Sequence, residues 1–464
     1  MHTSLTKKLG LSVAALAMVA TSLFTASDAE AVPAFARQTG MSCNSCHFQT
    51  YPSLNGMGRS FKAGNFAMKG AQTAIEGENI DLPSSLNVSA IWKSYYISSD
   101  DAVGEIAYSD EIALLVGGRA AAGVGFLWEL GQAGQDAEVE GHADVDDTSD
   151  TFGEVTAEGG TNGNFLSSKI GFTAVQSGST SFSVIPYTTD ALGSAYGFEL
   201  MNTAAVRNGR AIEKRDAMSA SSDFHIGNGE ATGIALVAAD LATGWWVNVA
   251  LWAPVADGGH ADLTGLANSV RVGYFFDLAG FDTGVAYMMR SGEVKTTDGT
   301  TDDKGNNVQN VNAKVAGTLL DFQMQGQVGG NDLGLYVSYA AAADSHDLDE
   351  YTFDSTTGDL TGATVHADGY VEGGGSGLGL TVKYSVTPKI HVHYATNSWA
   401  HAAAYTAAES NSGDAITTDA YTRASVGVDY KVSENIALQA FQYTSADMGG
   451  DSHSKMYLGW FMGL

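Results

Sequence analysis

Phe281-Asp282-Thr283-Gly284-Val285-Ala286-Tyr287-Met288-Met289-Arg290 is the stretch of sequence that decides the fold. Its odd-numbered positions are mostly apolar or aromatic, whereas its even-numbered positions are mostly charged or small. Side chains alternate between the two faces of a β-strand, so this pattern predicts a strand with one apolar and one polar face. The same period recurs over 389–394 and 423–432. We therefore expect β-structure from Leu86 onward.

The connections between the predicted strands alternate in length, which favours a membrane barrel over a soluble sandwich. Outer-membrane barrels have short periplasmic turns and long external loops. Short turns are expected at 241–243, 279–280, 329–330, 387–388 and 433–435. Long loops are expected near 99–109, 133–163, 207–231, 255–267, 292–311, 343–375 and 398–420.

The prediction is an all-β fold with a transmembrane, antiparallel outer-membrane β-barrel of 16 strands over 86–464. The stretch 180–206 is too long for one strand, and the pattern leaves open a bulge or a plug segment there. The best apolar candidate for a membrane helix in this region, 234–255, is interrupted by Asp240, Gly244 and Asn248.

The first 31 residues are typical of an export signal. Lys7 and Lys8 precede the apolar stretch Leu9–Phe24, and Ala29-Glu30-Ala31 is a small-x-small cleavage site, so 1–31 is predicted to be a signal peptide. The formal net charge of −29 argues against nonspecific binding of nucleic acid or anionic lipid. We therefore expect no nucleic-acid partner and a surface that faces cations.

The two cysteines of the chain belong to one motif, Cys43-Asn44-Ser45-Cys46-His47. C-x-x-C-H is the attachment pattern of c-type haem, in which two thiols bind the porphyrin covalently and the histidine binds the iron. A zinc site would need more thiol or imidazole ligands, and 32–85 contains no other Cys or His. A thioredoxin-type dithiol would need a βαβ context, which the pattern lacks. The prediction is one covalently bound haem c, with His47 as the proximal iron ligand.

The haem-binding domain is predicted over 32–85, a small, helical or irregular c-type cytochrome segment in or at the barrel lumen. A domain this small rarely builds an adequate core alone, so the haem is expected to supply most of it. Met41, Met57 and Met68 are the candidates for the distal iron ligand. Met68 is favoured because a helix and a turn could carry it to the opposite haem face; a core methionine or an open iron site is the alternative.

Arg37 and Arg59 flank the motif and are possible partners for the haem propionates, with structural ion pairing as the alternative.

The segment from Phe35 to Lys62, followed by the 16-strand pattern, resembles the fused cytochrome–porin family of iron-oxidising bacteria. The similarity covers Phe35-Ala36-Arg37-Gln38-Thr39-Gly40, the C-x-x-C-H motif, Pro52, Gly58-Arg59 and Phe61-Lys62; over the barrel it concerns the architecture only. The resemblance implies an outer-membrane protein that takes electrons from extracellular Fe(II) through one haem. A periplasmic electron carrier, such as a soluble cytochrome, would receive them. An electron conduit for another donor, or for outward flow, is the alternative.

Three further groups of residues have both a functional and a plainer interpretation. Carboxylates over 136–158 and 344–372 could concentrate cations such as Fe(II), or could only keep the loops soluble. His391 and His393 share the predicted inward face, where they could bind a metal or simply line the lumen. A basic cluster could pair with the propionates or form a solvated loop; its members are Arg207, Arg210, Lys214 and Arg215.

Overall fold

The structure of this chain is a computed structural model. It describes residues 34–68, 72, 74–76, 81–83, 87–99, 104–133, 165–189, 193–203, 221, 226, 229–254, 266–296, 311–344, 373–404, 406, 416–446 and 452–464. The predicted signal peptide, the acidic stretch 136–158, most of 344–372 and the basic cluster between Arg207 and Arg215 lie outside these residues.

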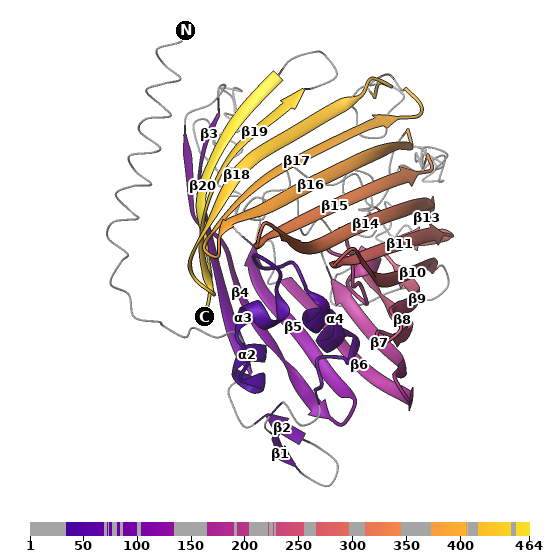
Figure 1. The fold of residues 1–464 in the computed structure, drawn as a ribbon. Coiled ribbons are helices and arrows are strands. Elements are labelled where there is room, and N and C mark those ends of the chain that lie inside the picture. Colours follow the sequence, from indigo (N-terminus) through magenta and orange to yellow (C-terminus); the bar gives the residue numbers. More distant parts are fainter. Residues whose placement is uncertain are drawn as a thin grey trace, which may run out of the picture.

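Sixteen strands form one closed barrel in which each strand pairs antiparallel with its neighbours (Figure 1). The first eight are β3 (Val88–Ser99), β4 (Glu105–Ala121), β5 (Val124–Ala133), β6 (Phe165–Ser177), β7 (Thr180–Thr189), β8 (Ala231–Asp240), β9 (Trp245–Ala253) and β10 (Ala267–Leu278). The other eight are β11 (Phe281–Ser291), β14 (Gly317–Val328), β15 (Asn331–Ala342), β16 (Gly375–Thr387), β17 (Ile390–His401), β18 (Tyr421–Ser433), β19 (Ile436–Ala446) and β20 (Ser452–Gly463). The predicted fold class is confirmed.

Pairing of β20 with β3 closes the barrel, with Lys455 opposite Ser99 and Gly463 opposite Ile91. Ala90 and the terminal Leu464 also exchange two backbone hydrogen bonds, at 2.9 and 2.7 Å. Closure leaves no unpaired strand edge, which is the condition for a sheet to exist in a bilayer.

The predicted alternation of turns is present. The short turns are gathered at one end of the barrel, which we call the short-turn mouth; they are 122–123, 178–179, 241–244, 279–280, 329–330, 388–389 and 434–435. The strand ends that the longer connections join form the opposite end, which we call the long-loop end. In outer-membrane barrels the short turns face the periplasm.

Side chains on β11 alternate as the sequence predicts. Val285, Tyr287 and Met289 point outward, with 37%, 43% and 44% of their surface exposed. Met288 and Arg290 point into the barrel and are buried. An apolar outer face on a closed antiparallel barrel is the surface that lipid requires, so the chain spans the outer membrane with its strands. Among the described residues, no helix is long and apolar enough to cross a bilayer.

The stretch 180–206 does contain a plug segment. β7 ends at Thr189, the short helix η1 (Gly193–Ala195) follows, and residues 193–203, the lumen segment, are buried inside the barrel. Glu199 of this segment forms an ion pair with Arg271 of β10 at 2.8 Å. The same guanidinium pairs with Asp321 of β14 at 2.6 Å, which fixes the lumen segment to two strands.

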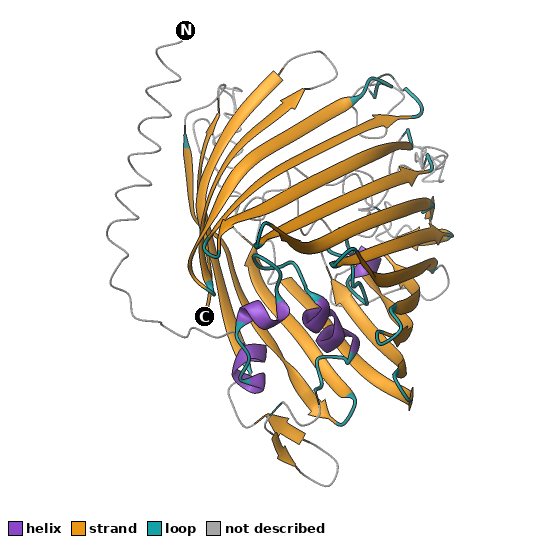
Figure 2. Cartoon of the chain, viewed as in Figure 1, coloured by secondary structure: helices purple, strands orange, loops and turns teal. Residues whose placement is uncertain are grey.

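Three short helices precede the barrel in the chain and lie near its short-turn mouth (Figures 1 and 2). They are α2 (Ala34–Thr39), α3 (Cys43–Cys46) and α4 (Gly56–Ala63). We call residues 34–68, which contain them, the plug domain. A small hairpin of β1 (Ala74–Glu76) and β2 (Asp81–Pro83) follows, and a second hairpin joins β12 (Glu293–Thr296) to β13 (Val311–Lys314).

Candidate functional site

The C-x-x-C-H motif forms helix α3, and a barrel residue caps it. The Cys43 amide N–H donates to Glu434 Oε2 at 2.9 Å, and the Asn44 carboxamide donates to Glu434 Oε1 at 3.0 Å. The Ser42 side chain, at the N-cap position, makes no capping hydrogen bond. A carboxylate is favourable at a helix N-terminus because the N–H groups there lack partners within the helix. Glu434, in the turn between β18 and β19, therefore holds α3 in place.

His47 is held in a defined tautomer by the loop that follows it. Its Nδ1 lies 3.3 Å from the Ser53 carbonyl oxygen, which also accepts the Phe48 amide at 2.8 Å. A carbonyl only accepts, so Nδ1 carries the proton and Nε2 carries the lone pair. This is the usual arrangement of a metal-ligating histidine, whose second nitrogen donates to a carbonyl or carboxylate.

Tyr51 lies beside the His47 ring and fixes the same loop to the barrel. The two ring centroids are 5.3 Å apart in an edge contact, and Tyr51 stacks on Phe461 of β20 at 4.9 Å. The imidazole is thus packed as well as hydrogen-bonded.

The two thiols fit covalent attachment better than redox or zinc chemistry. Cys43 and Cys46 are half-buried, are not joined as a disulfide, and lie three residues apart on one short helix. Burial raises the pKa of both thiols, and the Glu434 carboxylate raises that of Cys43 further. A redox-active cysteine instead has a lowered pKa. Among the described residues, no group of three or more His, Cys, Asp and Glu side chains could hold a metal ion.

Helix α4 packs directly on α3. Asn55 caps α4 by accepting the Gly58 amide at 3.0 Å, and its carboxamide donates to the Ser45 carbonyl at 3.1 Å. A Cβ atom at Gly58 would collide with the Cys46 carbonyl oxygen. Glycine at this position therefore permits the close crossing of the two helices.

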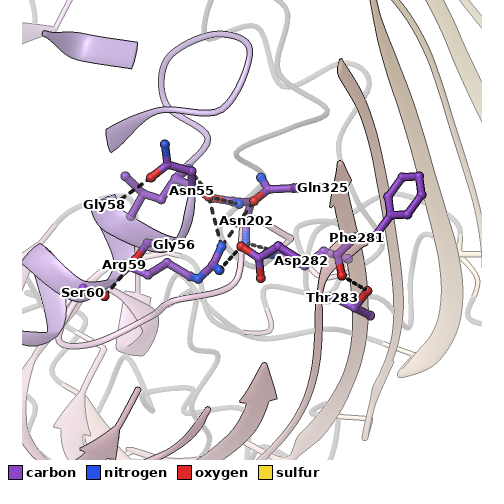
Figure 3. Close-up of polar contacts among 12 residues, drawn as sticks. Asn55, Gly56, Gly58, Arg59, Ser60, Asn202, Phe281, Asp282, Thr283 and Gln325 are labelled. Carbon is purple, nitrogen blue, oxygen red and sulfur yellow. Dashed lines mark hydrogen bonds and ion pairs between the residues drawn. The ribbon is translucent and has the colours of Figure 1, made fainter. Parts of the chain in front are cut away.

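Arg59 fastens α4 to the barrel wall (Figure 3). Its guanidinium forms an ion pair with Asp282 of β11, donates to Gln325 of β14 at 3.3 Å, and lies 4.1 Å from the centre of the Phe275 ring. The arginine side chain is 4% exposed. The structure thus places Arg59 in the ion-paired role that the sequence left open beside propionate binding.

Two lysines, on β16 and β18, bind the loop around α3. Lys431 donates to Asn44 Oδ1 at 2.6 Å and to the Gln49 carbonyl at 3.2 Å, and Lys383 donates to Thr50 Oγ1 at 2.6 Å. These contacts lie near the turns 388–389 and 434–435. The motif therefore sits inside the short-turn mouth.

Helix α2 and the end of the plug domain contact the wall formed by β3 to β7. Arg37 donates to the Val88 carbonyl, and Gln38 donates to the Gly117 carbonyl at 2.6 Å. Asn65 lies so close to β5 that a Cβ atom at Gly125 would collide with its carbonyl oxygen. The plug domain is thus attached around much of the barrel circumference.

Met68 lies beyond α4, in the part of the plug domain that packs towards α2. It is half-buried, and its amide donates to Gln72 Oε1 at 2.8 Å. Met57 lies in the first turn of α4, next to Gly58. Gly58 is the residue that contacts Cys46, so Met57 is closer in the chain to this contact than Met68 is. The assignment of Met68 as distal ligand stays a prediction.

His391 and His393 both face the lumen, as expected. His391 lies 2.8 Å from Ser385 Oγ and is 2% exposed, while the His393 ring packs 4.4 Å from that of Phe441. No described trio of metal-binding side chains includes them. Their surroundings favour the lumen-lining interpretation.

Sequence reasoning did not identify Glu434, Lys431 or Asn202 as residues of this site. Asn202 accepts the Leu54 amide and donates to the Leu54 carbonyl, at 2.8 and 2.9 Å. All three are far from the motif in the chain, and no local pattern marks them. The long stretch 180–206 was the one available signal, and it pointed to the segment that contains Asn202.

No family model and no curated protein matches the chain. Among solved structures, OprB of Pseudomonas putida is similar with a TM-score of 0.49 at 10% identity, covering 81% of this chain and 93% of that one. OmpF of Salmonella typhi has a TM-score of 0.45 at 9% identity, with coverages of 84% and 100%. OmpT, an outer-membrane protein of Vibrio cholerae, has a TM-score of 0.44 at 10% identity and the same coverages.

Replacing Arg59 should loosen the plug domain without opening the barrel. Arg59→Met removes the pair with Asp282 and the hydrogen bond to Gln325, each worth about 1–3 kcal/mol for a charged group in a partly buried setting. We expect limited proteolysis to cut residues 34–68 several times faster in folded protein. Arg423→Met is the matched control, because Arg423 stacks on Trp399 at 4.4 Å near the long-loop end. Equal cleavage rates in the two variants would contradict the anchoring role.

Met68→Ala should abolish the methionine-to-iron absorption band of the haem-loaded protein, because the distal ligand would be lost. Met57→Ala is the matched control, since Met57 is also half-buried in the plug domain. Loss of the band in Met57→Ala alone would assign the iron to Met57 instead.

Proposed function

We propose that this outer-membrane barrel is a cytochrome–porin fusion. It binds one haem c covalently through Cys43 and Cys46, with His47 as proximal iron ligand, and transfers electrons from extracellular Fe(II) to a periplasmic electron carrier. The observation that carries the proposal is the His47 Nδ1 hydrogen bond to Ser53 beside two half-buried thiols. This donor set fits a c-type haem and suits neither a redox dithiol nor a zinc site.

The position of the plug domain supports a role in crossing the membrane. A hydrocarbon core of about 30 Å is wider than a single haem, so one haem serves both sides only from within the lumen. The plug domain lies in the short-turn mouth. The lumen segment is buried in the barrel and contacts the plug domain through Asn202 and Leu54. Two occupants of one lumen are difficult to reconcile with a passive diffusion pore.

A bound haem would supply a one-electron couple, and its potential would depend on the axial ligands and on the hydrogen bonds around them. The protein residues hold the site in place: Glu434 fixes α3, the Ser53 carbonyl orients His47, and Arg59 fixes α4. Packing of Tyr51 between His47 and Phe461 helps to fix the orientation of the imidazole. These residues position a redox centre and need no substrate pocket.

The identity of the electron donor and the direction of electron flow separate this proposal from its alternative. A conduit for another donor, or for outward flow, would use the same motif and the same barrel. Fe(II) is favoured by the resemblance of residues 35–62 to the iron-oxidising family and by the formal charge of −29, which attracts cations.

The haem should remain on the chain after complete unfolding. Denaturing gel electrophoresis followed by haem staining should show one stained chain, because thioether bonds survive detergent. Cys43→Ala combined with Cys46→Ala should remove the stain, whereas Ser45→Ala, between the two thiols, should retain it. Haem that is extracted from wild-type protein by acidified acetone would rule out covalent attachment.

Aqueous Fe(II) should reduce the haem-loaded protein at a rate that falls with ionic strength. The carboxylates concentrate the cation, and added salt screens this attraction because the Debye length shrinks to about 3 Å at 1 M. Stopped-flow mixing with Fe(II) measures the rate, and neutralising the carboxylates of 136–158 should slow it while leaving the haem spectrum unchanged. Failure of Fe(II) to reduce the haem, where another donor succeeds, would replace the iron oxidase with the alternative conduit. Reduction at a rate independent of salt and loop charge would support the Fe(II) oxidase but reject cation attraction by the loops, whose carboxylates would then serve only solubility.

A further inference from the structure

One peptide group connects His47 to the lumen segment. The carbonyl of the Ser53–Leu54 peptide lies 3.3 Å from His47 Nδ1, and the N–H of the same peptide donates to Asn202 Oδ1 at 2.8 Å. Asn202 Nδ2 also donates to the Leu54 carbonyl at 2.9 Å. Asn202 therefore holds the peptide whose carbonyl oxygen accepts the hydrogen bond from the imidazole N–H.

Asn202 is itself held rigidly. It is fully buried, and its backbone N–H donates to Gln323 Oε1 of β14 at 2.8 Å. Three residues earlier, Glu199 forms the 2.8 Å ion pair with Arg271. Figure 3 shows Asn202 between the start of α4 and the strands that carry Asp282 and Gln325. The position of the Ser53–Leu54 peptide is thus set by the barrel wall through one carboxamide.

Hydrogen bonds in such a chain strengthen one another. When Asn202 Oδ1 accepts the Leu54 N–H, it polarises the Ser53–Leu54 peptide, and the Ser53 carbonyl oxygen becomes a better hydrogen-bond acceptor. A better acceptor at Nδ1 makes the imidazole a more basic ligand, and a more basic ligand stabilises the ferric state over the ferrous state. The effect of Asn202 on a bound haem would therefore be a lower reduction potential.

We infer that Asn202 is a positioning residue for His47, and that the lumen segment thereby tunes the reduction potential of the site. The inference rests on the proposed function, since it requires haem at Cys43, Cys46 and His47. It gives the lumen segment a role beyond filling the barrel, because this segment follows the long-loop end of β7 and is linked to His47 through the Ser53–Leu54 peptide.

Redox titration of haem-loaded Asn202→Ala against wild type tests the inference. We expect an upward shift of the midpoint potential, because the Ser53 carbonyl loses its polarising partner. Asn248→Ala is the matched control: Asn248 is also buried and donates to the Phe198 carbonyl of the same lumen segment at 3.0 Å, but from β9. Its midpoint potential should stay at the wild-type value.

A second variant separates polarisation from simple loosening. Asn202→Asp loses the Nδ2 donor to the Leu54 carbonyl but keeps the acceptor Oδ1 for the Leu54 N–H and strengthens it with negative charge, so its midpoint potential should fall rather than rise. Shifts of the same sign in Asn202→Ala and Asn202→Asp would overturn the inference, as would equal shifts in Asn202→Ala and Asn248→Ala. Resistance of the barrel to trypsin confirms folding of each variant. Haem staining of the wild type is read first: absence of haem rejects the proposed function, whereas haem with an unchanged potential rejects only the role of Asn202.

Discussion

The hydrogen bonding of the backbone in a bilayer is the constraint on which the rest of this structure depends. Lipid offers no partners for N–H and C=O groups, so the sheet must close on itself, and β20 pairs with β3. Closure turns one face of every strand towards lipid and the other towards an enclosed space. The outward face must then be apolar, while the inward face is free to carry Arg271, Asp321 and Asp429. Everything inside the barrel is positioned against that inward face.

The plug domain shows how a small segment gains structure from such a wall. Phe35, Phe61 and Phe66 pack together, with Phe35 at 5.1 Å from each of the other two rings. This cluster is too small to be the whole core of an independent domain. The remaining stabilisation comes from outside the segment, through Glu434 at α3, Arg59 with Asp282, and Asn65 against β5. The C-x-x-C-H motif and the barrel therefore form one structural unit, although they are distinct in sequence.

The sequence predicted the barrel well because strand periodicity and turn length are local properties. The alternation over 281–290 and the short turn at 329–330 both appear in the structure as expected. The C-x-x-C-H spacing is local as well, and the covalent haem that it predicts stays a prediction. What it could not predict is which barrel residues would complete the site. Glu434 and Asn202 act through pairings set by the curvature and closure of the sheet, and the ion pair of Arg59 was only one of two open alternatives.

The Glu434 cap bears on the order in which the protein assembles. Cys43 and Glu434 are 391 positions apart, and the cap depends on the turn between β18 and β19, near the C-terminus. Helix α3 can therefore take up its final position only after nearly all the strands of the barrel have formed. Thiols that are half-buried in the finished protein are still accessible before that stage. A group attached to these thiols would therefore be added while the chain is still open, before the last hairpins enclose the motif.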